Sequence, residues 1–110
     1  MDGRSLIELA EEHLQIARGS GSGRSAVTVF GGHEHDMRQT LIALQAGALL
    51  HEHESPREAT LHVLVGEVRV CAGGDTWQGS AGDYLIIPAE RHELEATSDA
   101  AVLLTVATRA

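Results

Sequence analysis

Cysteine and aromatic residues are scarce in this chain, and each scarcity narrows what the chain can be. A single cysteine, Cys71, excludes an internal disulfide bond and favours a reducing compartment. It ends the sequence Val-Arg-Val-Cys ahead of two glycines, and we expect a buried, inert thiol there. Aromatic residues make up only 3% of the chain, so its core must consist of valine, leucine, isoleucine and alanine.

Basic residues and long apolar runs are scarce as well. Eight Lys and Arg residues stand against 16 Asp and Glu residues, which gives a formal net charge of -8. Because a nucleic-acid surface needs clustered basic side chains, this balance argues against a nucleic-acid partner. The sequence shows neither a signal peptide nor an apolar run that could span a bilayer, so we expect a cytoplasmic protein with no membrane partner.

The remaining composition is that of one globular domain. The 110 residues are enough for a single core, and 43% hydrophobic with 22% charged residues is typical of a folded chain. The pattern predicts a short helix over residues 4–18, where Ser5 caps the first turn and Glu8 follows three residues later. A Gly/Ser connector comes next. We therefore expect residues 1–25 to form a helix with its connector, and residues 26–110 to form a β-domain.

From residue 26 onward, short apolar stretches alternate with turns rich in Gly, Asp and Ser. This spacing is typical of an all-β sandwich or barrel. The stretch over residues 37–50 is apolar on both faces, as expected for a strand that is covered on both sides or lies at a subunit contact. The predicted strands cover residues 27–30, 37–50 with an interruption at 46–47, 60–65, 68–71, 76–78, 84–87, 92–96 and 101–108.

Three histidines lie in or directly after predicted strands, beside apolar residues. His51 and His53 are two residues apart, so both imidazoles point to one face of a strand, the face they share with Leu49. His92 shares a face with Leu94 in a much later strand. An inward imidazole without a partner costs about 1–3 kcal/mol. The histidines therefore bind a common metal or ligand, or they satisfy one another and nearby backbone carbonyls.

A turn at residues 55–56 brings an acidic residue, Glu58, beside the His-x-His pair. With His51, His53 and His92, this carboxylate completes a candidate four-ligand metal site. Nitrogen and oxygen ligands in this combination suit a divalent transition metal such as Zn, Fe, Mn, Ni or Cu.

Two stretches carry a family resemblance. One stretch resembles the first cupin motif, because it contains the motif's residue types in the same order, namely Gly47, His51, His53, Glu58 and Gly66. The second cupin motif is similar to Gly82, Pro88 and His92. The resemblance implies an all-β cupin fold of the RmlC-like kind, a jelly-roll barrel (double-stranded β-helix), with one divalent metal inside it. It also implies a homodimer and no organic cofactor.

The motif does not decide whether Glu58 is the acidic metal ligand. Counting the register back from Gly66 places Ala59 at the ligand position and turns Glu58 outward, whereas a local β-bulge would bring Glu58 back. A second His-x-His pair, His33 and His35, lies in a polar stretch and is interpreted as a solvated loop.

Two functions follow from this resemblance. The first is a cupin that binds a divalent metal or a small organic ligand, or both, without chemistry of its own. The second is a metal-dependent enzyme, a dioxygenase or isomerase, acting on a small organic molecule. The same fold carries unrelated activities, so the choice depends on the site. We favour the binding function, because the sequence offers no evident acid–base pair near His92.

Overall fold

The structure, a computed structural model, describes residues 1–51 and 58–108. Its one described helix, α1 (Leu6–Arg18), begins as predicted: the Ser5 Oγ accepts a hydrogen bond from the Glu8 amide at 3.2 Å. The helix buries one stripe of small and aliphatic residues, Leu9, Ala10, Leu14 and Ala17. Within the described residues, no helix is both long and apolar enough to cross a membrane.

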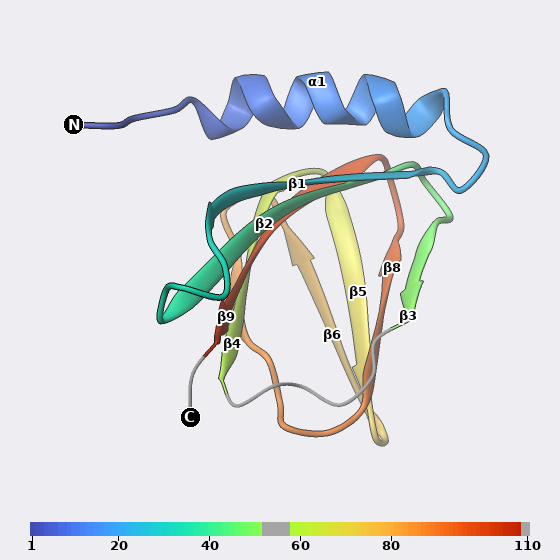
Figure 1. The fold of residues 1–110 in the computed structure, drawn as a ribbon. Helices are drawn as coiled ribbons and strands as arrows, with labels where there is room; N and C mark the ends of the chain where they lie inside the picture. Colours follow the sequence, from blue (N-terminus) through green and yellow to red (C-terminus); the bar gives the residue numbers. More distant parts are fainter. Residues whose placement is uncertain (52–57, 109–110) are drawn as a thin grey trace.

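Nine strands form two antiparallel sheets in the described part of the chain (Figure 1). The five-stranded sheet contains, in spatial order, β1 (Arg24–Gly31), β2 (Met37–Leu44), β9 (Ala100–Ala107), β4 (Ala59–Val65) and β7 (Tyr84–Ile86). The four-stranded sheet contains β3 (Leu49–His51), β8 (His92–Ala96), β5 (Glu67–Ala72) and β6 (Asp75–Ser80). Among the described residues, strand pairing does not join the two sheets into a closed ring.

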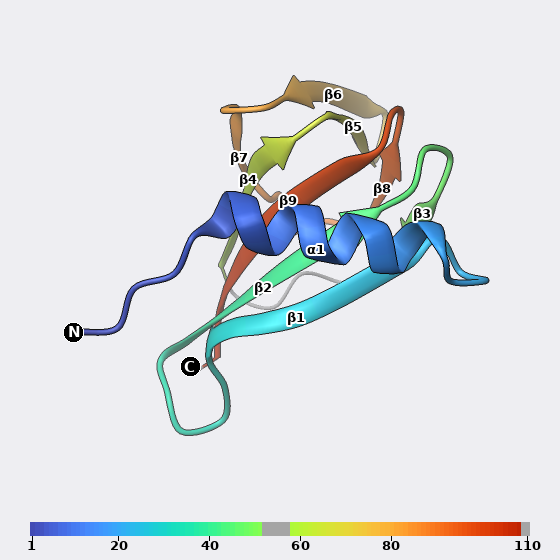
Figure 2. The ribbon, with the colours of Figure 1, turned by 90° about the horizontal axis from the view of Figure 1, so that it is seen from above.

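The strand β2 is covered on both faces, as its sequence predicts. Ile42 and Leu44 face the core between the two sheets. Leu41 and Ala43 face the helix, which lies across β1, β2 and β9 when the molecule is seen from above (Figure 2). The helix therefore packs on the five-stranded sheet of its own chain. Each fully buried leucine of this kind contributes roughly 1.5–3 kcal/mol of transfer free energy.

The interruption predicted at residues 46–47 is present in the structure. It divides the stretch over residues 37–50 into β2 and β3, which belong to different sheets. The division falls at Gly47, whose φ of 89° is in the left-handed region and whose amide donates to the Ala96 carbonyl at 2.8 Å.

The expectation of a buried thiol at Cys71 is wrong. Val68 and Val70 occupy the inward positions of β5, with 1% and 3% of their surface exposed. Because side chains alternate along a strand, Cys71 points outward and is exposed.

Candidate functional site

The core between the two sheets contains a small cavity near the start of β8. Its volume of about 20 Å³ is room for about one water molecule. Seven aliphatic residues and one histidine line it, namely Ile42, Leu50, Leu61, Val70, Ile87, His92, Leu94 and Leu104. These residues come from both sheets, so the cavity is part of the molecule's main core.

His92 supplies the polar group of this cavity. It is the first residue of β8 and pairs with Ala72 of β5, and its side chain shares the inward face of β8 with Leu94 and Ala96. This alternation confirms the face predicted from the sequence. The Nδ1 atom lies 3.0 Å from the Glu90 carbonyl oxygen. A carbonyl only accepts, so Nδ1 carries the proton of this bond, and in the tautomer protonated at Nδ1 alone the Nε2 atom is an acceptor.

His51 lies on the other face of the same strand pair. It pairs with Glu93 across β3 and β8, and its Nδ1 atom is 2.9 Å from the Glu93 Oε2 atom. Its side chain is 71% exposed. The inward residue of β3 is Leu50, which pairs with Leu94. The expectation that His51 and Leu49 share an inward face is therefore wrong. In β3 the inward position is Leu50, so Leu49 and His51 point outward.

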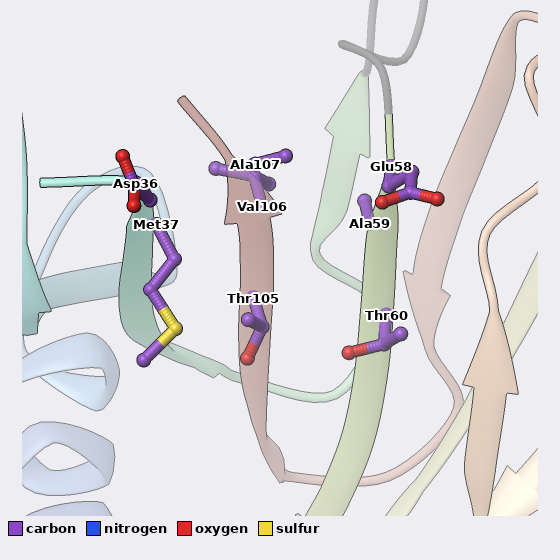
Figure 3. A pocket seen from close by; sticks show the side chains of 8 residues that line it. All are labelled: Asp36, Met37, Glu58, Ala59, Thr60, Thr105, Val106 and Ala107. Carbon is purple, nitrogen blue, oxygen red and sulfur yellow. The ribbon is translucent and has the colours of Figure 1, made fainter. Parts of the chain in front are cut away.

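Glu58 also lies away from the cavity. It is exposed and precedes β4, whereas Ala59 is 6% exposed and belongs to the core between the sheets. Glu58 instead lines a pocket of about 220 Å³ that crosses β2, β9 and β4, together with Met37, Thr60 and Thr105 (Figure 3). Of the two registers left open by the sequence, the structure has the one in which Ala59 points inward.

The predicted metal ligands therefore do not come together among the described residues. His92 faces the cavity, His51 and Glu58 face elsewhere, and His53 lies outside the described residues. No three His, Cys, Asp or Glu side chains are placed to hold a metal ion in the described part of the chain, and that search includes His33 and His35. The described donors do not fit a metal inside the fold. The four-ligand set of His51, His53, His92 and Glu58 stays a prediction.

Comparison with known proteins identifies the family. Residues 40–108 match the model of the cupin domain, which is well over half of the chain. The chain is a cupin. A search of curated protein sequences gave no match.

Several solved structures share this cupin's fold at low sequence identity. An RmlC-like cupin from Desulfovibrio desulfuricans is 21% identical with a TM-score of 0.73, covering 98% of this chain and 97% of its own. KdgF from a Halomonas species is 20% identical with a TM-score of 0.69, covering 83% and 84%. A putative ethanolamine utilization protein Q from Salmonella typhimurium is 18% identical with a TM-score of 0.68, covering 77% and 69%. At these identities the likeness shows the fold alone.

Most residues that line this cupin's cavity cannot be recognised from the sequence. Leu50 and Leu104 are examples, because an aliphatic residue in an aliphatic core carries no chemical signal. One signal was present. Glu93 alternates with His92 and Leu94 and therefore lies on the outer face of its strand, and a pairing of His51 with Glu93 places the imidazole on that face too.

Proposed function

We propose that this cupin binds a small, largely apolar organic molecule between its two sheets, with His92 as the polar anchor. One observation carries the proposal: among the described residues, the lining of the cavity is aliphatic except for the His92 imidazole. Ligand sites in proteins commonly combine an apolar wall with few, well-placed polar groups. In the tautomer protonated at Nδ1, the Nε2 atom accepts a hydrogen bond, so the matching ligand carries a hydroxyl or N–H donor at one end and hydrocarbon at the other.

The volume of the cavity limits which ligands can bind. About 20 Å³ holds one water molecule, which the donor group of the ligand replaces. A hydrocarbon tail of several carbon atoms needs more room than this, so side chains that line the cavity must move to admit it. We therefore expect affinity to depend on chain length, with the smallest alcohols and amides bound most readily.

The lining supports binding rather than catalysis. In the part of the chain that the structure describes, His92 is the one titratable side chain that lines the cavity. General acid–base catalysis needs a positioned group with a tuned pKa beside a reacting atom, and usually an acid and a base with separate roles. A binding module is therefore the function that the cavity supports best, and the dioxygenase or isomerase alternative has no comparable support.

The first test is a ligand titration followed by NMR. Methyl spectra of the protein are recorded with increasing ethanol, propanol and propionamide. We expect shifts in the methyl groups of Leu50, Leu94 and Leu104. His92→Ala should weaken binding at least tenfold, about 1.4 kcal/mol.

His51→Ala is the matched control, because it removes an imidazole from the outer face of the same strand pair. It should leave the titration unchanged. The proposal fails if these methyl groups do not shift, or if His92→Ala and His51→Ala weaken binding equally.

The predicted metal site needs its own measurement. Purified protein expressed with Zn, Fe, Mn, Ni and Cu is analysed for bound metal before and after a chelator. The four-ligand set requires that His51→Ala and His92→Ala both lower the metal content. Since His51 points outward and pairs with Glu93, we expect His51→Ala to have no effect.

A further inference from the structure

The start of the chain and the first two strands line a further pocket, separate from the cavity between the sheets. Its volume is about 400 Å³, within the range of ligand sites in proteins. The lining comes from the segment before α1, the first residue of α1, β1 and β2. The segment before α1 and the turn between β1 and β2 lie at the same end of the molecule in both views (Figure 1, Figure 2).

A β-bulge in β1 builds the apolar wall of this pocket. The pairing of β1 with β2 shifts between Thr28 and Phe30, so Val29 and Phe30 together stand opposite Gln39. Gln39 lies two residues from Leu41, which faces the helix, so it points to the same face of the sheet. In a regular strand Val29 and Phe30 would point to opposite faces, whereas here both line the pocket. Bulges that redirect a side chain in this way are frequent beside active sites.

Phe30 is the largest apolar group of this wall, and 47% of its surface is exposed. The ring of His35, from the turn between β1 and β2, contacts it edge to face, with 4.9 Å between the ring centroids. Leu6 and Met37, which is 39% exposed, complete the wall. Exposed apolar side chains that lie together mark a binding surface. The wall therefore fits an aromatic or branched aliphatic group.

Two opposite charges stand beside this apolar wall. Asp2 and Arg4 are two residues apart before the helix, and both line the pocket. Within the described residues, neither side chain forms an ion pair or a hydrogen bond. A guanidinium group binds a carboxylate through two parallel hydrogen bonds, and an aspartate accepts hydrogen bonds from an ammonium group. Gln39 adds an amide whose Nε2 atom donates to the Thr105 Oγ1 atom at 3.2 Å, which leaves Oε1 as an acceptor.

A ligand that complements this pocket carries a positive charge, a negative charge and a large apolar group. A free α-amino acid has all three on one carbon atom, whereas a residue inside a peptide lacks both charges. At about 30 Å³ for each non-hydrogen atom, as in liquid water, the pocket holds roughly thirteen atoms, about the size of phenylalanine. We propose that this pocket binds a free α-amino acid with a large apolar side chain. Arg4 holds its carboxylate, Asp2 holds its ammonium group, and Phe30 contacts its side chain.

The test is a titration of the full chain with L-phenylalanine, followed by NMR. We expect a dissociation constant of about 1 mM or lower. Two analogues each remove one charge: phenylalaninamide lacks the carboxylate, and N-acetylphenylalanine lacks the ammonium group. Each should bind at least about fivefold more weakly than phenylalanine, the ratio that one exposed charge pair supplies.

Three variants assign the contacts of the ligand. Arg4→Gln should remove the preference for phenylalanine over phenylalaninamide and keep the preference over N-acetylphenylalanine. Asp2→Asn should do the reverse. Phe30→Ala should weaken the binding of all three ligands at least about tenfold, because it removes the aromatic part of the wall.

Arg24→Gln is the matched control, because it removes the same charge at the other end of β1. His92→Ala separates this pocket from the cavity between the sheets. Both should leave the three affinities unchanged, and circular dichroism verifies that every variant is folded. Phenylalanine that does not bind at about 10 mM overturns the proposal. So do equal affinities for the three ligands, and so does an equal effect of Arg4→Gln and Arg24→Gln.

Discussion

At the scale of single residues, Gly66 and Gly47 differ in what a substitution by alanine would cost. At both positions the left-handed backbone disfavours a side chain, and at Gly66 the side chain would also clash with a neighbouring residue. Both have left-handed φ angles, 76° and 89°. A Cβ atom on Gly66 would lie 2.0 Å from the Asp99 carbonyl oxygen, whereas one on Gly47 meets nothing within 4 Å. We expect Gly47→Ala to lower the free energy of unfolding by about 1–2 kcal/mol through backbone conformation alone, and Gly66→Ala to lower it by about 4 kcal/mol or more.

Urea unfolding followed by Trp77 fluorescence measures both variants. Trp77 packs against the core between the sheets, so its signal reports loss of that core. Equal losses in Gly66→Ala and Gly47→Ala would show that the Asp99 backbone moves aside at little cost, contrary to the close packing of this turn.

The candidate site also depends on single residues. The inward position of His92 could be predicted, because its strand alternates clearly between His92, Leu94 and Ala96 and the acidic residues Glu93 and Glu95. The position of His51 could not, because Leu49, Leu50 and the residues before them are all apolar and fit either face. A shift of one residue along a strand reverses every side chain. Only the pairing with β8 fixes this choice, and that pairing is a property of the fold.

At the scale of elements, Asp99 joins the end of the helix to two turns. Its Oδ1 atom accepts a hydrogen bond from the Ala46 amide at 2.8 Å, and its Oδ2 atom is 2.8 Å from Nε of Arg18. The Ala46 amide, and then Arg18, hold the pKa of Asp99 below its ordinary value. A carboxyl with a lowered pKa in the folded state stabilises above the pKa of the unfolded state, about 3.9. That stability is lost as the pH falls through the folded pKa.

We therefore expect Asp99→Asn to flatten the pH dependence of stability below about pH 4. The loss at neutral pH should be no more than about 1 kcal/mol, because the group is partly exposed and screened. Thermal unfolding from pH 2.5 to 7 measures it. Asp75→Asn, in the exposed hairpin between β5 and β6, removes the same charge as a control. The same pH profile in both variants would contradict this role for Asp99.

The positions of helices and strands along the chain were predicted more reliably than which strands pair with each other. The helix cap at Ser5 and the strand His92–Ala96 follow from local chemistry, and both are present. The interruption at residues 46–47 was predicted, but the membership of β2 and β3 in different sheets was not, because both strands are apolar and the apolar pattern does not identify a strand's neighbours. Register and sheet membership come from contacts between distant residues, which a local pattern does not contain.

At the scale of the whole molecule, β2 links two cores. Leu41 packs under α1, Leu44 packs between the sheets, and both are 0% exposed. Because one strand carries both contacts, we expect the helix and the two sheets to unfold as one unit rather than as separate segments 1–25 and 26–110. Leu41→Ala and Leu44→Ala should each lower the free energy of unfolding by about 2–5 kcal/mol.

Two probes test this unity in the same samples. Circular dichroism at 222 nm follows α1, and Trp77 fluorescence follows the core between the sheets. Leu41→Ala weakens the contact of the helix, yet it should shift both transitions by the same amount, as Leu44→Ala should. A helix signal that is lost at lower urea than the Trp77 signal in Leu41→Ala would mean that α1 detaches on its own. Residues 1–25 would then unfold separately from residues 26–110. The lost packing of Leu41 would destabilise the helix without destabilising the core between the sheets.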